Sequence, residues 1–209
     1  ALTDGEKKMV GMGTKVLIWP DKMSFDTAAW TLSALGSSWQ QGGRSLTVTP
    51  CDAAGVVYTP NLFGATEPES PENGDVWLKQ AEDAPWSYRD ALKLYSTAGG
   101  WQNILLNYCR VTCEGLGEAF KAGDTVTLTG IPSVVKNAYS SDFSGDVVVD
   151  DVAGDSVILS IAPDIESVLY YGTCVVTGQS VVWTAMDGKT TQTFDGPFPD
   201  VTAQRRVPD

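Results

Sequence analysis

Short segments in which apolar and polar residues alternate recur along the chain, with about ten residues between successive segments. Residues 45–49 show this most clearly, because Leu46 and Val48 alternate with serine and threonine. A period of two is typical of a strand with one buried face. The apolar run at 16–19 is followed by Pro-Asp-Lys, a turn signal. This spacing predicts an all-β fold of antiparallel strands in a meander, with a propeller-like arrangement as an alternative.

The middle of the chain predicts a hairpin that carries tryptophan. Residues 65–74 hold two prolines, three glutamates and a closing Asn-Gly, a composition typical of an exposed linker. We expect residues 75–79 and 92–95 to pair as strands, and a Gly-Gly turn then leads into Trp101. We interpret Trp77 and Trp101 as a cross-strand pair that holds the hairpin together.

From Tyr108 onward the alternation is more regular, and about five strands fit between 108 and 183, enough to close a small β-barrel. No stretch predicts more than a single turn of helix. We therefore divide the chain into four parts: N-terminal antiparallel strands (1–64), a linker and Trp-containing β-hairpin (65–106), an inserted small β-barrel (107–176), and closing strands that lead to a missing C-terminal part (177–209).

The charge of the chain argues against nucleic acid as a partner. There are 26 acidic and 14 basic residues, a net charge of −12, and the compact basic groups are only Lys7-Lys8 and Arg205-Arg206. Nucleic-acid-binding domains normally carry a basic patch. No apolar run reaches the ~18–20 residues that span a membrane, so we expect no membrane partner. The chain opens without Met or the order of a signal peptide, and we expect that it either begins after processing or is a piece of something longer.

The absence of histidine lowers the expectation of catalysis. It removes Ser-His-Asp and Cys-His arrangements and the usual general base near neutral pH. We predict a non-enzymatic protein without catalytic, metal or cofactor-binding residues. Glycoside hydrolysis stays open as an alternative, since its two carboxylates meet only in space.

Two further sets of side chains, four aspartates and four cysteines, give only weak indications of a metal site or of disulfide bonds. Oxygen-rich loops bind calcium, but the spacing of Asp142, Asp146, Asp150 and Asp151 matches no EF-hand loop, and we interpret these aspartates as solvated strand ends. The four cysteines form no C-x-x-C pair in a chain long enough to fold without disulfides. We expect them to be buried thiols.

The loop between the hairpin strands holds the best candidates for recognition. Trp86 and Tyr88 lie in the segment APWSYRD, where turn-flanked aromatics have less reason to belong to a core. Their rings could stack on sugars. The alternative is that they only pack or anchor a protein interface.

Several motifs resemble virion proteins of tailed phages and prophages of Gram-positive, gut-type bacteria. The strand-turn-strand GMGTKVLIWPDKMSFDT resembles a segment near the start of such proteins, and P-x-x-GDVW followed by LKLYS…W resembles a hairpin of tail and tail-fibre proteins. CRVTCEGLGEAFKAGDTVTLTGI with GDVVVDDVAGDSVILSI is similar to their small barrel module, and AQRRVPD resembles a junction to propeller-like strands.

The resemblance implies a tail-associated structural protein of a phage or prophage particle, of which this chain is an N-terminal fragment. It implies assembly through protein–protein contacts with other virion proteins or with itself, in a virion assembled in the bacterial host cytoplasm. The competing hypothesis is a carbohydrate-binding module that attaches to cell-surface polysaccharide through Trp86 and Tyr88.

Overall fold

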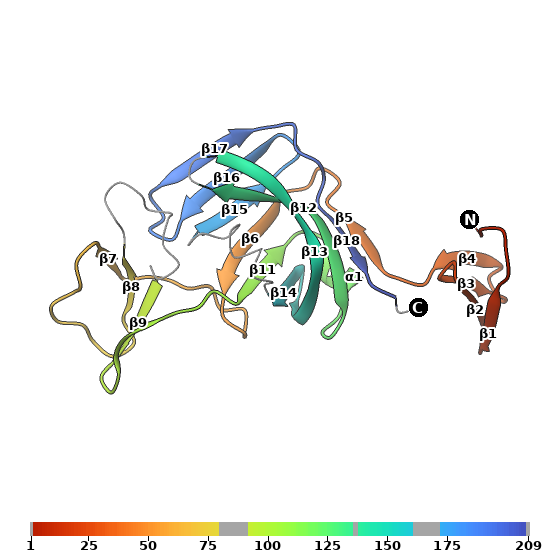
Figure 1. The fold of residues 1–209 in the computed structure, drawn as a ribbon, viewed down its shortest axis with the longest axis horizontal. Coiled ribbons are helices and arrows are strands. Elements are labelled where there is room, and N and C mark those ends of the chain that lie inside the picture. The colour runs from red at the N-terminus through yellow and green to blue at the C-terminus, as the bar shows by residue number, and fades with distance from the viewer. Residues whose placement is uncertain (1, 80–91, 136–137, 161–171, 208–209) are drawn as a thin grey trace.

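The computed structural model describes residues 2–79, 92–135, 138–160 and 172–207, and the structural statements below concern these residues. They form three β-sheets and one short helix, α1 (Leu116–Ala119). Figure 1 shows a body flanked at opposite ends by two smaller sheets. The predicted all-β, antiparallel fold is therefore confirmed.

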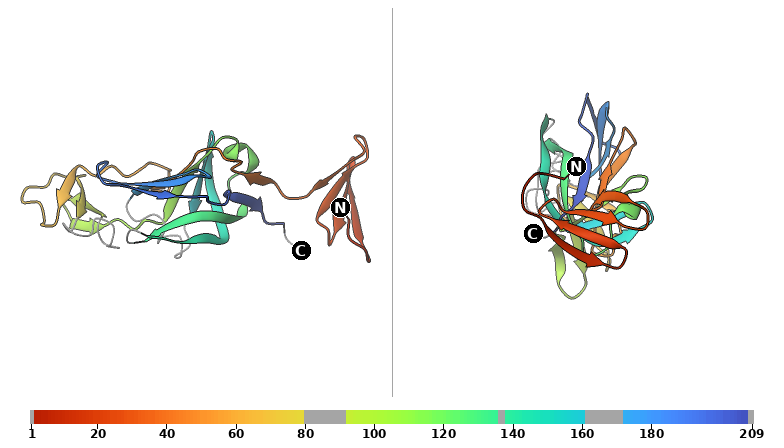
Figure 2. Two further views of the ribbon diagram at one scale, coloured as in Figure 1. Left: turned by 90° about the horizontal axis from the view of Figure 1, so that it is seen from above. Right: turned by 90° about the vertical axis from the view of Figure 1, so that its right-hand side faces the viewer.

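The N-terminal sheet is a meander of four consecutive strands. Its strands are β1 (Lys8–Met12), β2 (Lys15–Trp19), β3 (Met23–Asp26) and β4 (Thr31–Ala34), each antiparallel to the next. Figures 1 and 2 show that this sheet projects from one end of the body. At its base the Lys22 Nζ donates a hydrogen bond of 2.8 Å to the carbonyl oxygen of Val207.

The sheet at the other end contains the predicted hairpin. It has the order β10-β9-β8-β7, built from β7 (Leu62–Gly64), β8 (Val76–Lys79), β9 (Leu92–Ser96) and β10 (Gly100–Asn103). The rings of Trp77 and Trp101 are in contact, with centroids 5.4 Å apart. They lie on β8 and β10, on either side of β9, so this pair ties together three strands rather than the two that we expected.

The body is an open sheet of ten strands in the order β17-β16-β15-β6-β11-β14-β13-β12-β18-β5. The bounds of these strands are β5 (Ser38–Gln40), β6 (Leu46–Cys51), β11 (Tyr108–Thr112), β12 (Thr125–Val135), β13 (Ala138–Ala153), β14 (Ser156–Ser160), β15 (Gly172–Val176), β16 (Ser180–Ala185), β17 (Thr191–Asp195) and β18 (Thr202–Arg205). Leu46 and Val48, taken from the period of two, are fully buried on β6.

The barrel expected within 107–176 does not close among the described residues, and that expectation was wrong. β6 lies between β15 and β11, while β18 and β5 continue the sheet beyond β12. Strands from elsewhere in the chain thus occupy the edges that would have had to meet. The four-part division of the chain stays a prediction, although β5 and β6 of its first part pair into this sheet.

One face of the ten-stranded sheet encloses a single hydrophobic core, to which nearly every strand of the sheet contributes. The buried Gln41 side chain bonds across this curled sheet. Its Nε2 donates to the carbonyl oxygens of Arg44 (2.6 Å) and Val176 (2.9 Å), and its Oε1 accepts from the Val201 N–H (3.1 Å). These bonds fasten the β5–β18 end of the sheet to β15.

Candidate interaction surface

The register of the N-terminal sheet places only apolar residues on one of its faces. Side chains alternate between faces along a strand, and cross-strand partners share a face. One row joins Met9 to Ile18, Met23 and Ala34, and the row two residues further along joins Gly11 to Val16, Phe25 and Leu32. We call these eight residues the apolar face.

The opposite face is mixed. It carries Lys8, Val10, Met12, Lys15, Leu17, Trp19, Ser24, Asp26, Thr31 and Ser33. The N–H groups of Ala29 and Ala28 lower the pKa of Asp26, and the Lys15 ammonium on the neighbouring strand lowers it further. A face that carries charges is suited to water, whereas the apolar face is not.

Much of the apolar face is open to solvent. Met9 is 64% exposed and Leu32 is 41% exposed, whereas Ile18, which lies between other strands, is 5% exposed. Trp30, in the β3–β4 turn, is 80% exposed, and its ring meets the Phe25 ring at a centroid distance of 5.8 Å. Neither hydrophobic core of the molecule includes a residue of β1–β4. Clustered exposure of this kind marks interaction sites in proteins.

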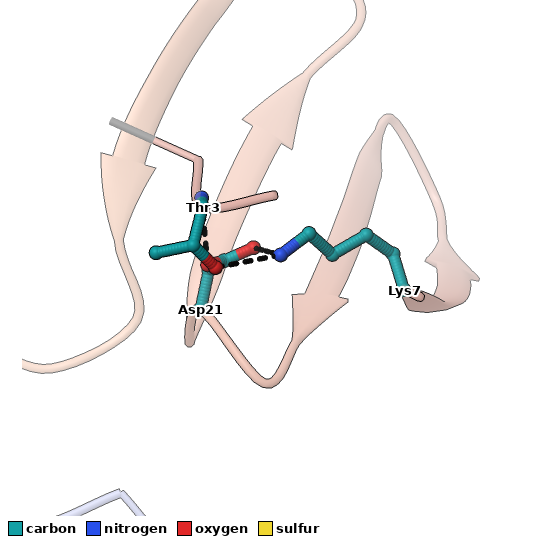
Figure 3. A network of polar contacts seen from close by, with 3 residues as sticks. All are labelled: Thr3, Lys7 and Asp21. Carbon is teal, nitrogen blue, oxygen red and sulfur yellow. Dashed lines mark hydrogen bonds and ion pairs between the residues drawn. The ribbon is translucent and has the colours of Figure 1, made fainter. Parts of the chain in front are cut away.

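A small polar network fixes the start of the chain to the β2–β3 turn. As Figure 3 shows, the side chains of Thr3 and Lys7 converge on Asp21. The Lys7 Nζ lies 2.6 Å from the Asp21 carboxylate and donates to the Thr3 hydroxyl at 2.8 Å, and the Thr3 N–H and hydroxyl both donate to Asp21. These bonds, led by that from Lys7, lower the pKa of Asp21 to about 2. The carboxylate is therefore ionised at neutral pH.

A shallow hollow of about 340 Å³ lies where the N-terminal sheet meets the body. Arg205 and Arg206 line it, but each faces a carboxylate: Arg205 lies 3.8 Å from Asp124, and Arg206 lies 2.7 Å from Asp146. These arginines are thus already compensated by the protein's own acids.

Of the four aspartates singled out in the sequence, Asp142 has a side chain outside the described part of the structure, and the other three each bind a different partner. Asp146 accepts from the Thr127 hydroxyl at 2.6 Å, Asp150 accepts from the Ser160 hydroxyl, and Asp151 accepts from the Val152 N–H. They lie within β13 and are exposed, rather than at strand ends as we expected. Within the described part of the chain, no three Cys, Asp or Glu side chains are placed to share a metal ion.

The cysteine side chains are buried and form no disulfide, as expected. Burial raises the pKa of the Cys51 thiol to about 11 and that of Cys174 to about 12, and it raises the pKa of Cys109 as well. Because the thiolate is the reactive form, these side chains are poor nucleophiles at neutral pH.

The residues that we predicted for recognition, Trp86 and Tyr88, lie outside the described residues. Sequence reasoning missed the apolar face. The available signal was an apolar residue at every second position, Val16 and Ile18 on β2 and Met23 and Phe25 on β3. On β2 this period of two is concealed, because the intervening Leu17 and Trp19 are apolar as well.

Searches among protein-family models, curated proteins and solved structures found no match to this chain. Among the described residues, no helix has the length and apolar character needed to cross a membrane.

Proposed function

We propose that this chain is a non-enzymatic structural module that acts through protein–protein assembly. The observation that carries the proposal is the apolar face on a sheet that projects from the body (Figure 1). Met9 and Leu32 lie open on this face, and Trp30 extends the exposed apolar surface. Covering such a surface releases the water in contact with it, which drives association.

We place this module in a phage or prophage particle, in association with its tail. The support is the likeness of the motifs at 11–27, 71–101 and 109–161 to virion proteins of tailed phages. Its partners are then neighbouring virion proteins or further copies of itself. The apolar face provides a physical means for that assembly.

Mass spectrometry of purified particles tests this placement. A bacterial strain that carries the gene is induced, particles are purified on a density gradient, and peptides of this chain are sought. We expect the chain to co-purify with capsid and tail proteins and its gene to lie among theirs. Its absence from particles, with a gene among polysaccharide-utilisation genes, would overturn the virion assignment.

A carbohydrate-binding module is the competing outcome, supported by the sequence around Trp86 and Tyr88 alone. Affinity electrophoresis on cell-wall polysaccharides separates the two functions. Under our proposal the chain migrates alike in gels with and without polysaccharide. Retardation that is lost in a Trp86→Ala variant would favour carbohydrate binding, and retardation that persists would place the sugar site elsewhere.

A further inference from the structure

We infer that the apolar face binds the same face of a second copy of this chain. The inference rests on the proposed function and names a partner for its surface. It follows from three properties of the N-terminal sheet: the chemistry of the face, the distribution of charge along the chain, and the area available.

The chemistry of the face is self-complementary. Since none of its eight residues has a charged or polar side chain, a matching surface must also be apolar. A two-fold axis presents the same patch on both subunits and meets this requirement without a second protein. Two such sheets would pack face to face at a spacing of about 10 Å, as in a β-sandwich.

The charge distribution favours association at this sheet. Residues 1–34 contain four acids (Asp4, Glu6, Asp21 and Asp26) and four lysines (7, 8, 15 and 22), so the segment is neutral. The remaining residues then hold 26 − 4 = 22 acids and 14 − 4 = 10 bases, which is the whole net charge of −12. Two copies therefore repel through their bodies but not through their N-terminal sheets, which project away from those bodies (Figure 2).

The available area predicts a weak dimer. Four strands about 4.8 Å apart, with a rise of about 3.3 Å per residue, give a face of roughly 19 by 16 Å. Allowing for the relief of the side chains, two faces would bury about 600–1,000 Å² in total, below the ~1,200 Å² of a standard stable interface. Association should therefore be reversible. It should strengthen with salt, because salt screens the repulsion between the acidic bodies.

Sedimentation equilibrium on the 209-residue chain tests the inference, over about 10 μM to 1 mM, the range suited to a small interface. The wild type should show a monomer–dimer equilibrium. Met9→Glu places a charge on the apolar face and should weaken dimerisation at least ~10-fold, since a buried unpaired charge is costly. Met12→Glu is the matched control. Both methionines are on β1 and are 64% exposed, but Met12 lies on the opposite face, so its change should stay within about two-fold.

A second pair of variants introduces no charge, and is therefore expected to perturb the folding of the sheet less than the glutamate variants do. Leu32→Ala on the apolar face should weaken dimerisation about three- to ten-fold, while Val10→Ala on the opposite face should leave it unchanged. A wild type that stays monomeric throughout, or equal losses in both members of a pair, would overturn the inference.

The two proposals can fail separately. A monomeric chain that is nevertheless found in purified particles would remove the self-association and leave the structural function in place. A chain that dimerises through this face but is absent from particles would keep the self-association and remove the placement in a phage particle.

Discussion

The N-terminal sheet and the ten-stranded sheet are built from the same kind of strand but differ in whether their apolar face is covered. In the ten-stranded sheet one face closes over a core, and Trp183 is 1% exposed. In the N-terminal sheet the apolar face has no such cover, and Trp30 is 80% exposed. Both sheets have their backbone hydrogen bonds, but the N-terminal sheet leaves large apolar side chains such as Met9 and Leu32 exposed.

The difference separates two contributions to stability. Strand pairing exchanges hydrogen bonds with water for hydrogen bonds within the chain, with a modest net gain per bond. Burial of apolar surface supplies most of the remaining free energy. The N-terminal sheet has the pairing but little of the burial, and we propose that a partner supplies the missing burial by covering the apolar face.

The largest difference between the two sheets should appear when one tryptophan is removed from each. Trp183→Ala opens a cavity in the core and should lower the free energy of unfolding by about 3–5 kcal/mol. Trp30→Ala removes an exposed side chain and should change it by less than about 0.5 kcal/mol. Urea denaturation monitored by circular dichroism measures both. Equal losses would contradict the contrast between the sheets.

A smaller effect should follow from replacing the buried amide of Gln41. Gln41→Leu strands the carbonyls of Arg44 and Val176 and the N–H of Val201, and should cost about 2–4 kcal/mol. The side chain of the exposed neighbour Gln40 donates a hydrogen bond to the Asp200 carboxylate, and Gln40→Leu should cost under about 1 kcal/mol. The same denaturation assay ranks the two. If the two variants have the same free energy of unfolding, the hydrogen bonds of the Gln41 side chain do not stabilise the sheet.

The smallest and most local effect concerns the pH dependence of the N-terminal sheet. The pKa of Asp21 is lowered from 3.8 to about 2, so its network contributes fully above pH 3.8. That contribution is lost as the pH falls towards 2, and the protection factors of the amides at residues 3–8, measured against their intrinsic exchange rates at each pH, should then fall. Lys7→Met should raise the pKa of Asp21 in a carboxyl NMR titration, whereas Lys8→Met should leave it in place. A similar shift in both variants would show that general charge, not the Lys7 contact, lowers the pKa.

Much of the secondary structure could be predicted from local pattern. The period of two at 45–49 identified β6, and the strand-like runs at 75–79 and 92–95 identified β8 and β9. These predictions succeeded because alternation and turn residues are local properties of the chain. Alternation does not specify a partner, however, and nothing local in β6 indicates that it lies between β15 and β11. The barrel was expected for this reason.

The candidate site was harder to predict than the strands. Leu17 and Trp19 make β2 look apolar on both faces, as in a strand buried on both sides. Only the pairing of Val16 with Gly11 and Phe25, and of Ile18 with Met9 and Met23, shows that one face lacks polar side chains altogether. The recognition role of Trp86 and Tyr88 stays a prediction.

The strand order also implies a sequence of events during synthesis. Every pairing of the N-terminal sheet lies within residues 8–34, whereas the β5–β18 ladder joins Gln40 to Thr202. Local pairings form quickly, and those between distant residues wait for the chain between them. The N-terminal sheet can form once residue 34 leaves the ribosome, long before β18 completes the body. Under the proposed self-association, two nascent chains on one messenger would therefore meet through their apolar faces before either body exists.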